Sequence, residues 1–348
     1  MAGKKENRPD PGFERLKADI KAGVPARAYI LAGQETYLKD HYLGRLRSLI
    51  LDGPMEDFNC KYIDGSDFDL NGFADAIDTP PSFAERTFVE VRDYQIFDID
   101  KDDTEEFISI ISDLPEWVCL VFVYDAIEYR RDGRRTGLAK AVKDNIVTVT
   151  IDEQERSDLI RWITSHFRAH GKNISRGDCD YLLFICGSLM SGLNSEIEKI
   201  ASWCSGDTVT RADIDAVAIP VLEAAVFDLT DALCERRFAK AADVLSDLIT
   251  MQNEPLPILG AIGTNFRRMF AVNVLDRNGA GMEELMSAVK TTSEYYARKL
   301  LEFSNRFGIR RLAKGIELCA QADMDLKGYS SSDPDRLSDL LVGLAGLS

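Results

Sequence analysis

The chain has 348 residues, a length that predicts two or three domains rather than one. Its composition, 45% hydrophobic and 29% charged, is that of an ordinary globular protein, and no apolar run is long enough to span a bilayer. The formal net charge of -16 makes the chain alone a poor candidate for binding DNA, because duplex binding depends largely on neutralising phosphates. The first residues lack the apolar segment of a signal peptide, so we expect a cytoplasmic protein.

Strands and helices alternate through the first half of the chain. Residues 1–25 are expected to form a flexible N-terminal arm that leads into a short helix at 13–21. The strands predicted after it are 28–33, 58–65, 86–93, 118–125 and 145–152. The helices predicted between them are 39–51, 69–78, 104–114 and 135–144. This alternation predicts an α/β domain over 26–151, with a mostly parallel five-stranded sheet covered by helices on both faces.

After Asp152 the strand pattern stops and only helical periodicity remains. Four helices are predicted, at 153–171, 175–187, 193–206 and 210–218, and they form a small helical domain over 152–219. Pro220 ends this region. From 220 to 348 further segments carry apolar stripes at helical spacing, separated by glycine and proline, which predicts an all-α C-terminal bundle.

The residues after the first strand have the outline of a phosphate-binding loop. A working loop reads G-x-x-x-x-G-K-[ST] between a strand and a helix. Gly33 takes the place of the first glycine and Lys39 that of the lysine, but Leu38 replaces the second glycine and Asp40 replaces the hydroxyl residue. The leucine side chain blocks close approach of a phosphate, and the Asp40 carboxylate would repel it.

ATPases with this loop also carry an acidic metal ligand at the end of an apolar strand. The strand at 86–93 ends in Arg92 and Asp93, which puts a cation where the ligand belongs, whereas Asp125 is the better match. Lys39 is either a remnant of phosphate chemistry or, as is more frequent, a solvated helix residue. We therefore expect a vestigial loop with no bound cofactor and no ATP hydrolysis.

Other chemistry has weaker support in the sequence. Seven cysteines occur without a C-x-x-C pair and the chain has only three histidines, so no zinc or other metal site is expected. His166 and His170 are four residues apart, a spacing that can bind metal, but we interpret them as exposed helix residues. Most of the cysteines lie among apolar residues, which predicts small core residues in a reducing compartment. No catalytic residue is predicted.

Several segments occur in a characteristic order along the chain. They are YILAGQETYLKDHYLGRL, FNCKYIDG, TPPSFAERTFVEVRD, VCLVFVYDAIEYRRDGRRTGLAKAVKD, LIRWITSHFRAHGKNIS and DALCERRFAKAADVLSDLITMQNEPLPILGAIGTNFRRMFAV. Together they resemble the delta subunit family of the bacterial DNA polymerase III clamp loader. The resemblance covers nearly all of the chain beyond the first 25 residues. It implies an AAA+-like domain with a degenerate P-loop, a helical lid at 152–219 and a C-terminal collar at 220–348.

The resemblance implies a non-catalytic subunit that binds and opens the DNA sliding clamp during replication. The subunit would belong to the DNA polymerase III holoenzyme, which as a whole is a DNA-directed DNA polymerase. The implied partners are the sliding clamp, the motor subunits and delta-prime through the collar, and primed DNA only within the assembled complex; no membrane partner is implied. The alternatives are a divergent P-loop ATPase that still uses Lys39 and Asp125, and a non-catalytic helical scaffold.

The wedge that the family inserts into the clamp falls on Ser82, Phe83 and Ala84. The family usually has two bulky apolar residues at the tip of a helix there, and only Phe83 fits, so Ala84 or another apolar neighbour is needed for the second. Without the resemblance, Phe83 would be read as a core residue beside a plain Pro80–Pro81 loop. Six arginines are candidates for contact with DNA or other subunits: Arg130, Arg131, Arg134, Arg135, Arg267 and Arg268. The alternative is that they are solvated surface residues.

Overall fold

The computed structural model describes residues 10–51, 56–252, 254–329 and 334–347. The chain divides into two compact units. The first unit is Met1–Gln154 with Leu189–Ser191, and the second is Glu155–Ser188 with Gly192–Ser348. The predicted separation of a lid from a collar stays a prediction, because the helices of both regions fall in the second unit.

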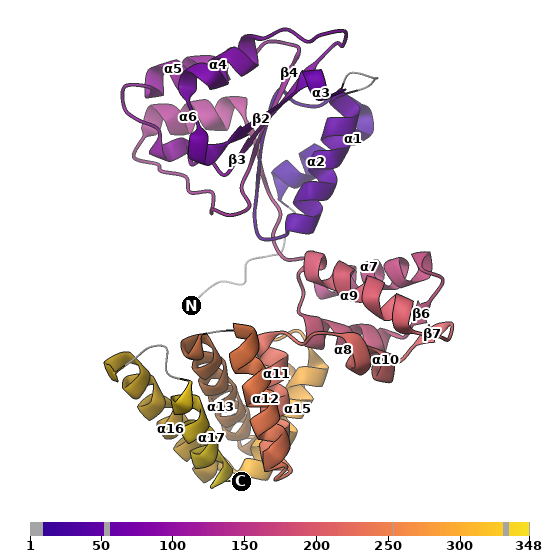
Figure 1. Ribbon diagram of the computed structural model, residues 1–348, viewed down its shortest axis with the longest axis vertical. Helices are drawn as coiled ribbons and strands as arrows, with labels where there is room; N and C mark the ends of the chain where they lie inside the picture. Colours follow the sequence, from indigo (N-terminus) through magenta and orange to yellow (C-terminus); the bar gives the residue numbers. More distant parts are fainter. Residues whose placement is uncertain (1–9, 52–55, 253, 330–333, 348) are drawn as a thin grey trace. The chain divides into compact units, whose positions relative to one another are not determined.

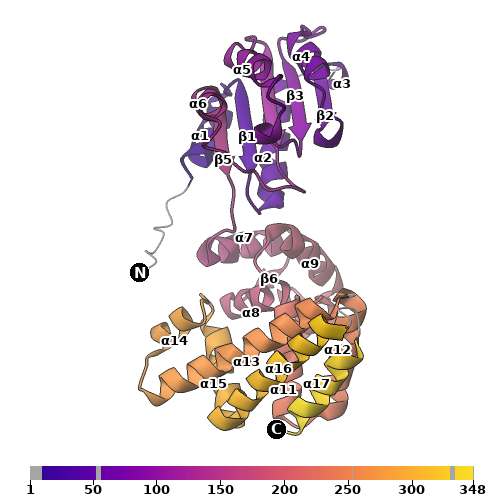
Figure 2. The same cartoon turned by 90° about the vertical axis from the view of Figure 1, so that its left-hand side faces the viewer.

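A five-stranded parallel sheet in the order β2-β3-β4-β1-β5 forms the centre of the first unit (Figures 1 and 2). Its strands are β1 (Ala28–Ala32), β2 (Cys60–Asp64), β3 (Thr87–Arg92), β4 (Val118–Val123) and β5 (Val147–Thr150). Every residue of β4 is buried, as expected for a strand with helices on both faces. The predicted sheet is therefore confirmed. The predicted strand at 58–65 is wrong at its start, because Phe58 and Asn59 end the short helix α3 (Glu56–Asn59).

Helices cover both faces of this sheet (Figure 1). One face carries α4 (Leu70–Asp78), α5 (Thr104–Ser112) and α6 (Thr136–Asn145), and the other carries α1 (Pro11–Ala22) and α2 (Thr36–Ile50). Successive side chains of a strand point to opposite faces, so Ile30 joins the first core while Tyr29 and Leu31 join the second. Two short 3₁₀ turns, η1 (Gly65–Asp67) and η2 (Ile96–Asp98), follow β2 and β3.

The predicted short helix at 13–21 is confirmed as α1, and its burial corrects the expectation that the whole of 1–25 is a flexible arm. The Asp10 carboxylate accepts a hydrogen bond from the Phe13 backbone N–H at 2.9 Å and so caps the helix. Leu16 is fully buried in the core on the α1 and α2 side of the sheet. The segment that includes α1 is therefore part of the folded unit, while residues 1–9 lie outside the described residues.

The second unit consists of helices and one small pair of strands. Its first helices are α7 (Arg156–Ala169), α8 (Arg176–Cys186), α9 (Met190–Trp203) and α10 (Arg211–Val217). The strands β6 (Asn173–Ile174) and β7 (Thr208–Val209) pair in parallel, which corrects the expectation that no strand follows Asp152. Strands of two residues have no periodicity that a sequence pattern could reveal.

The remaining helices pack around one apolar core and confirm the predicted all-α bundle (Figure 2). They are α11 (Leu222–Cys234), α12 (Phe238–Gln252), α13 (Pro255–Arg277), α14 (Met282–Ala288), α15 (Glu294–Phe307), α16 (Ile309–Tyr329) and α17 (Asp335–Ala345). The long helix α13 contacts α11, α12, α14, α15 and α16 and so lies at the centre of the bundle. Within the described residues, no helix is both long and apolar enough to cross a lipid bilayer.

Candidate functional site

The turn after β1 is shorter than a phosphate-binding loop, because α2 begins at Thr36 and Lys39 lies within the helix; its glycine is required by packing. Gly33 has a φ of 105°, and a Cβ built on it would lie 2.3 Å from the carbonyl oxygen of Ile151. The chain leaving β5 therefore requires a glycine here whether or not a phosphate binds. Leu38, in place of the second glycine, packs against the core formed with α1 and α2. Both positions serve packing.

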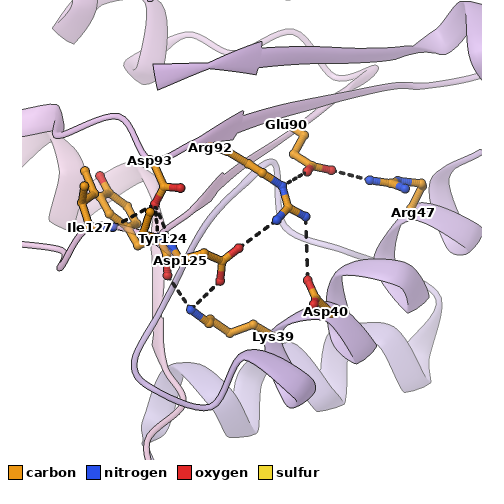
Figure 3. A network of polar contacts seen from close by, with 10 residues as sticks. Lys39, Asp40, Arg47, Glu90, Arg92, Asp93, Tyr124, Asp125 and Ile127 are labelled. Carbon is orange, nitrogen blue, oxygen red and sulfur yellow. Dashed lines mark hydrogen bonds and ion pairs between the residues drawn. The ribbon is translucent and has the colours of Figure 1, made fainter. Parts of the chain in front are cut away.

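Lys39 is used in an internal ion pair (Figure 3). Its side chain is only 2% exposed, and its Nζ lies 2.7 Å from Oδ1 of Asp125 and donates to the carbonyl oxygen of Tyr124. This burial contradicts the interpretation of Lys39 as a solvated helix residue. In a working loop the lysine is free to meet the phosphates and the acidic residue holds Mg²⁺. Here the two groups neutralise each other.

Arg92 extends this ion pair into a network of alternating charges (Figure 3). Its Nη1 lies 2.8 Å from Oδ2 of Asp125, and its Nε lies 2.6 Å from Oε1 of Glu90. Glu90 is also paired with Arg47, and Asp40 lies 3.7 Å from the Arg92 guanidinium. Burial alone would lower the pKa of Arg92. The hydrogen bond to Glu90 and the negative charges of Glu90, Asp125 and Asp40 outweigh burial, so the pKa of Arg92 is raised. The network is therefore stably charged and internally paired.

The loop after β4 is closed by a carboxylate from the neighbouring strand. Oδ1 of Asp93, which follows β3, accepts hydrogen bonds from the backbone N–H groups of Asp125, Ala126 and Ile127 at 2.8, 2.9 and 3.2 Å. Successive backbone amides that converge in this way form an anion-binding nest. Because Asp93 fills the nest, these amides are not available to a phosphate.

A pocket of 510 Å³ remains at the carboxyl edge of the sheet, where nucleotides bind in open α/β folds. Gly33 lines it together with residues of the loops after β4 and β5. Among the described residues, the charged side chains in its lining are Asp125, Glu128 and Asp152, and all three are carboxylates. Asp125 is already paired with Lys39 and Arg92, so the charges that oppose a triphosphate are those of Glu128 and Asp152. The geometry thus supports the expectation of a vestigial loop.

The part of the chain that the structure describes contains no group of three or more His, Cys, Asp or Glu side chains that could hold a metal ion. His166 instead lies against the Trp162 ring, with 3.9 Å between ring centroids. His170 is an exposed residue at the end of α7. All seven cysteines are free thiols, and burial raises the pKa of Cys119 to about 12. These features agree with structural roles.

The candidate wedge lies in the loop between α4 and β3, at the amino edge of the sheet. Because α4 ends at Asp78 and β3 begins at Thr87, Phe83 is in a loop and not at the tip of a helix. Phe83 is 95% exposed, which contradicts its alternative interpretation as a core residue. Its φ of 55° is in the left-handed region, which costs a residue with a side chain about 1–2 kcal/mol. Such a conformation persists only where surrounding contacts hold it.

Asn59 makes contacts of this kind with the residue that precedes Phe83. Asn59 is 2% exposed and is the last residue of α3, immediately before β2. Its Nδ2 donates to the Ser82 carbonyl oxygen at 2.9 Å, and the Ser82 backbone N–H donates to its Oδ1 at 2.6 Å. Both backbone polar groups of Ser82 are thereby fixed. No sequence pattern identified Asn59, because it stood inside a predicted strand.

A second exposed aromatic side chain lies near this loop. Phe58, which immediately precedes Asn59, is 66% exposed. Ser82 is exposed and Ala84 is partly buried, and neither is a bulky apolar residue. Phe58 is therefore a candidate for the missing second apolar position, because its neighbour Asn59 is bonded to Ser82. In the sequence Phe58 looks like any apolar residue of the predicted strand at 58–65.

Four of the candidate arginines follow β4. Arg130 is exposed and lies 3.5 Å from Glu128, Arg134 is exposed and lies 2.9 Å from Asp132, and Arg131 is exposed. The Arg135 guanidinium instead donates to the carbonyl oxygens of Phe97 and Ile99, both at 2.7 Å. Arg135 thus stabilises the chain after β3. The other three arginines, which are exposed, are more accessible to a partner.

The other two candidate arginines lie on α13. Arg267 donates to the Thr264 hydroxyl at 2.9 Å on an exposed part of the helix. Arg268 donates to the Tyr296 hydroxyl at 3.0 Å and so connects α13 with α15. For all six arginines, contact with DNA or another subunit stays a prediction.

Two sequence models of one family match the chain. The model described as "DNA polymerase III, delta subunit" matches residues 29–152. The model described as "DNA polymerase III delta subunit, C-terminal domain" matches residues 223–342, and the two together span more than half of the chain. The chain belongs to the DNA polymerase III delta subunit family. The first match contains both the vestigial loop and the Phe83 loop.

Individual members of the delta family match over most of their length. DNA polymerase III subunit delta of Bacillus subtilis (strain 168) is 24% identical over 315 residues, which cover 88% of this chain and 90% of that protein. The probable DNA polymerase III subunit delta of Aquifex aeolicus (strain VF5) is 22% identical over 338 residues, 95% of this chain and 94% of that protein.

A solved structure of a delta protein has the same fold. The Bacillus subtilis DNA clamp loader delta protein (YqeN) matches 96% of this chain and 99% of its own, with a TM-score of 0.50 and 21% sequence identity. The predicted fold class is confirmed. It is an α/β domain with a parallel five-stranded sheet, followed by a mostly helical region that ends in an all-α bundle.

Proposed function

We propose that this protein binds the DNA sliding clamp through Phe83 and opens the clamp during replication, without hydrolysing ATP itself. One observation carries the proposal: Phe83 is 95% exposed on a loop whose backbone is fixed by a buried side chain. An aromatic side chain presented in this way is typical of the anchor residues of protein interfaces. Membership of the delta family supports the sliding clamp as the partner.

Opening a ring requires no bond chemistry in this subunit. A protein that binds the open or strained clamp more tightly than the closed clamp shifts the clamp toward opening by the difference in binding free energy. ATP bound by neighbouring motor subunits would expose the Phe83 loop, and hydrolysis there would withdraw it. The Lys39–Asp125 ion pair and the carboxylate-lined pocket support the absence of ATPase activity in this chain.

The other proposed partners are the motor subunits and delta-prime, at the C-terminal bundle acting as the collar. Exposed apolar side chains on this bundle support a contact there; they are Phe238, Met251, Met324 and Val342. Primed DNA is proposed as a partner only in the assembled complex, because the net charge of -16 opposes binding by the chain alone. We place the assembly in the cytoplasm, where chromosomal DNA is copied in bacteria.

A binding experiment with the sliding clamp of the source organism tests the proposal. We expect the wild type to bind and Phe83→Ala to weaken binding at least tenfold, since truncation of an anchor residue typically costs 2 kcal/mol or more, or roughly thirtyfold in affinity. Phe58→Ala should weaken binding by a smaller factor. Ile127→Ala is the matched control, because Ile127 is an exposed apolar residue (37%) at the carboxyl edge of the same sheet. If Phe83→Ala binds as well as the wild type, the wedge role is wrong.

Calorimetry with Mg-ATP separates this proposal from the divergent ATPase. No heat of binding is expected. Lys39 is already paired with Asp125, and the carboxylates of the pocket repel the nucleotide. Measurable affinity that disappears in Lys39→Met would instead support an ATPase that uses Lys39 and Asp125. A folded wild type that binds neither the clamp nor nucleotide would support the helical scaffold.

A further inference from the structure

We propose that Asn59 is a positioning residue for clamp binding, which holds the Ser82 backbone so that Phe83 is already oriented when the clamp arrives. This inference rests on the proposed function and adds to it a residue that does not itself touch the clamp. Asn59 raises the affinity for the clamp by holding the loop in its binding conformation before the clamp binds.

The chemistry of the contact requires a carboxamide. An amide side chain carries a donor and an acceptor on one planar group, and so it can pair with the C=O and the N–H of a single residue. Asn59 makes both bonds to Ser82, at 2.9 Å through Nδ2 and 2.6 Å through Oδ1. An aspartate of the same shape would keep only the acceptor, and an alanine would keep neither.

The position of Asn59 connects the loop to the central sheet of the unit. Asn59 is 2% exposed and precedes β2, which pairs in parallel with β3 from Cys60 and Phe88 onward. Phe83, one residue beyond the tethered Ser82, is 95% exposed. Ser82, which Asn59 holds, and the exposed Phe83 are therefore joined by a single peptide unit. A change at Asn59 is expected to alter the conformation of Phe83 through that unit.

The conformation of Phe83 explains why this support is needed. Its φ of 55° is disfavoured for an aromatic residue, so a loop without tethers would spend most of its time in other conformations. Restricting a loop to its bound conformation raises affinity because less freedom is lost on binding. Pro80 and Pro81 restrict the approach from α4 through their fixed φ, but they leave Ser82 and Phe83 free to rotate.

A double-mutant cycle in the full chain tests the inference, with clamp dissociation constants measured for the wild type, Asn59→Ala, Phe83→Ala and the double variant. Asn59→Ala is expected to weaken binding about tenfold in the wild-type background, which corresponds to about 1.4 kcal/mol. In the Phe83→Ala background the same change should alter binding less than about twofold, because Asn59 acts through Phe83. Equal effects in both backgrounds, or no effect in either, would overturn the inference.

Two measurements on the free protein keep the inference testable if Asn59→Ala folds poorly. Cleavage by chymotrypsin after Phe83 should be several times faster in Asn59→Ala than in the wild type. Asn145→Ala is the matched control, since Asn145 also makes two side-chain hydrogen bonds, to Ser112 and Ala141, and should leave the cleavage rate unchanged. In the unmodified protein the Ser82 amide should exchange its hydrogen at least tenfold more slowly than an unstructured amide; an unprotected Ser82 amide overturns the inference.

Failure of the inference can be told apart from failure of the proposed function. If the wild type does not bind the clamp, the proposed function fails, and the positioning role in clamp binding fails with it. If the wild type binds, Phe83→Ala does not, and Asn59→Ala binds like the wild type, then only the inference fails.

Discussion

Lys39 shows how the neighbours of a residue decide its role. Three cations and three carboxylates alternate through the network. Lys39 pairs with Asp125, Arg92 pairs with Asp125, Glu90 and Asp40, and Glu90 also pairs with Arg47. Removing one partner of a buried ion pair is strongly destabilising, because it leaves the other charge buried without compensation. The lysine and the acidic residue that resemble a nucleotide site are therefore retained here for the stability of the fold.

This interpretation predicts the effect of Lys39→Met. The variant keeps the length of the side chain and removes its charge, so Asp125 loses one of its two cation partners but keeps Arg92. We expect the free energy of unfolding to fall by about 2 kcal/mol, measured by urea denaturation, which is less than the loss of a lone buried partner would cause. Lys17→Met, which breaks an exposed pair with Glu14, should change it by less than about 0.5 kcal/mol. Unchanged or increased stability in Lys39→Met would contradict the structural role.

Asp228, on α11, gives a prediction for the dependence of stability on pH. Burial raises the pKa of this carboxyl, Asp231 and Asp215 raise it further, and Lys240 lowers it. A carboxyl whose pKa is higher in the folded state stabilises the fold at pH values below its pKa in the unfolded chain. That contribution is lost as the pH rises through the folded pKa.

Asp228→Asn should therefore be more stable than the wild type at neutral pH, by up to about 1 kcal/mol. The difference should shrink as the pH falls through the raised pKa of the wild-type carboxyl. Urea unfolding of both proteins from neutral pH downward measures it. A difference that is the same at every pH would contradict the role of Asp228 burial.

At the scale of elements, α1 makes a testable contribution to the first unit. Leu16 is fully buried between α1 and the sheet, so Leu16→Ala removes apolar contact and leaves a cavity. We expect a loss of about 3 kcal/mol in the free energy of unfolding, measured by urea denaturation. Val24→Ala, at a position 67% exposed, should have almost no effect. If both variants are equally stable, α1 is the flexible arm that the sequence suggested.

The sequence predicted the elements whose signals are local. The apolar run of β4 and the alternation of strands and helices gave the sheet, because burial on both faces leaves a continuous apolar pattern. The start of β2 was misjudged because the apolar and polar alternation of the strand extends back through Phe58 and Asn59, which belong to a helix of four residues. α1 was underestimated because its polar N-terminal flank hid two buried residues, Leu16 and Ile20.

The candidate site was predictable in part, again where its signals are local in the sequence. The degenerate loop could be identified from Leu38 and Asp40, which are neighbours in the sequence. The burial of Lys39 and the tether from Asn59 to Ser82 could not, because each depends on a partner that is distant in the sequence and close only in the folded sheet. Phe83 required the resemblance, since an exposed and a buried phenylalanine look alike in a sequence.

At the scale of the molecule, the first unit keeps its two special regions at opposite edges of one sheet. The carboxyl edge holds the Lys39 network and the acidic pocket, and the amino edge holds the Phe83 loop. Parallel strands place all of their carboxyl ends together and all of their amino ends together, so this separation follows from the topology. Changes that neutralise the nucleotide region can therefore occur without altering the loop that we propose for clamp binding.

The charge of the whole chain predicts how it behaves toward DNA. With a formal net charge of -16, and with Arg130 and Arg134 already beside carboxylates, the chain alone should bind a fluorescent primed DNA no more tightly than about 10⁻⁴ M at physiological salt. Fluorescence anisotropy measures this, with the triple variant Arg130→Ala, Arg131→Ala and Arg134→Ala as the comparison. Both proteins should give the same weak signal, because phosphate neutralisation requires more cations than this surface supplies. Micromolar binding that weakens steeply with salt and disappears in the triple variant would show that the chain contacts DNA without its partners.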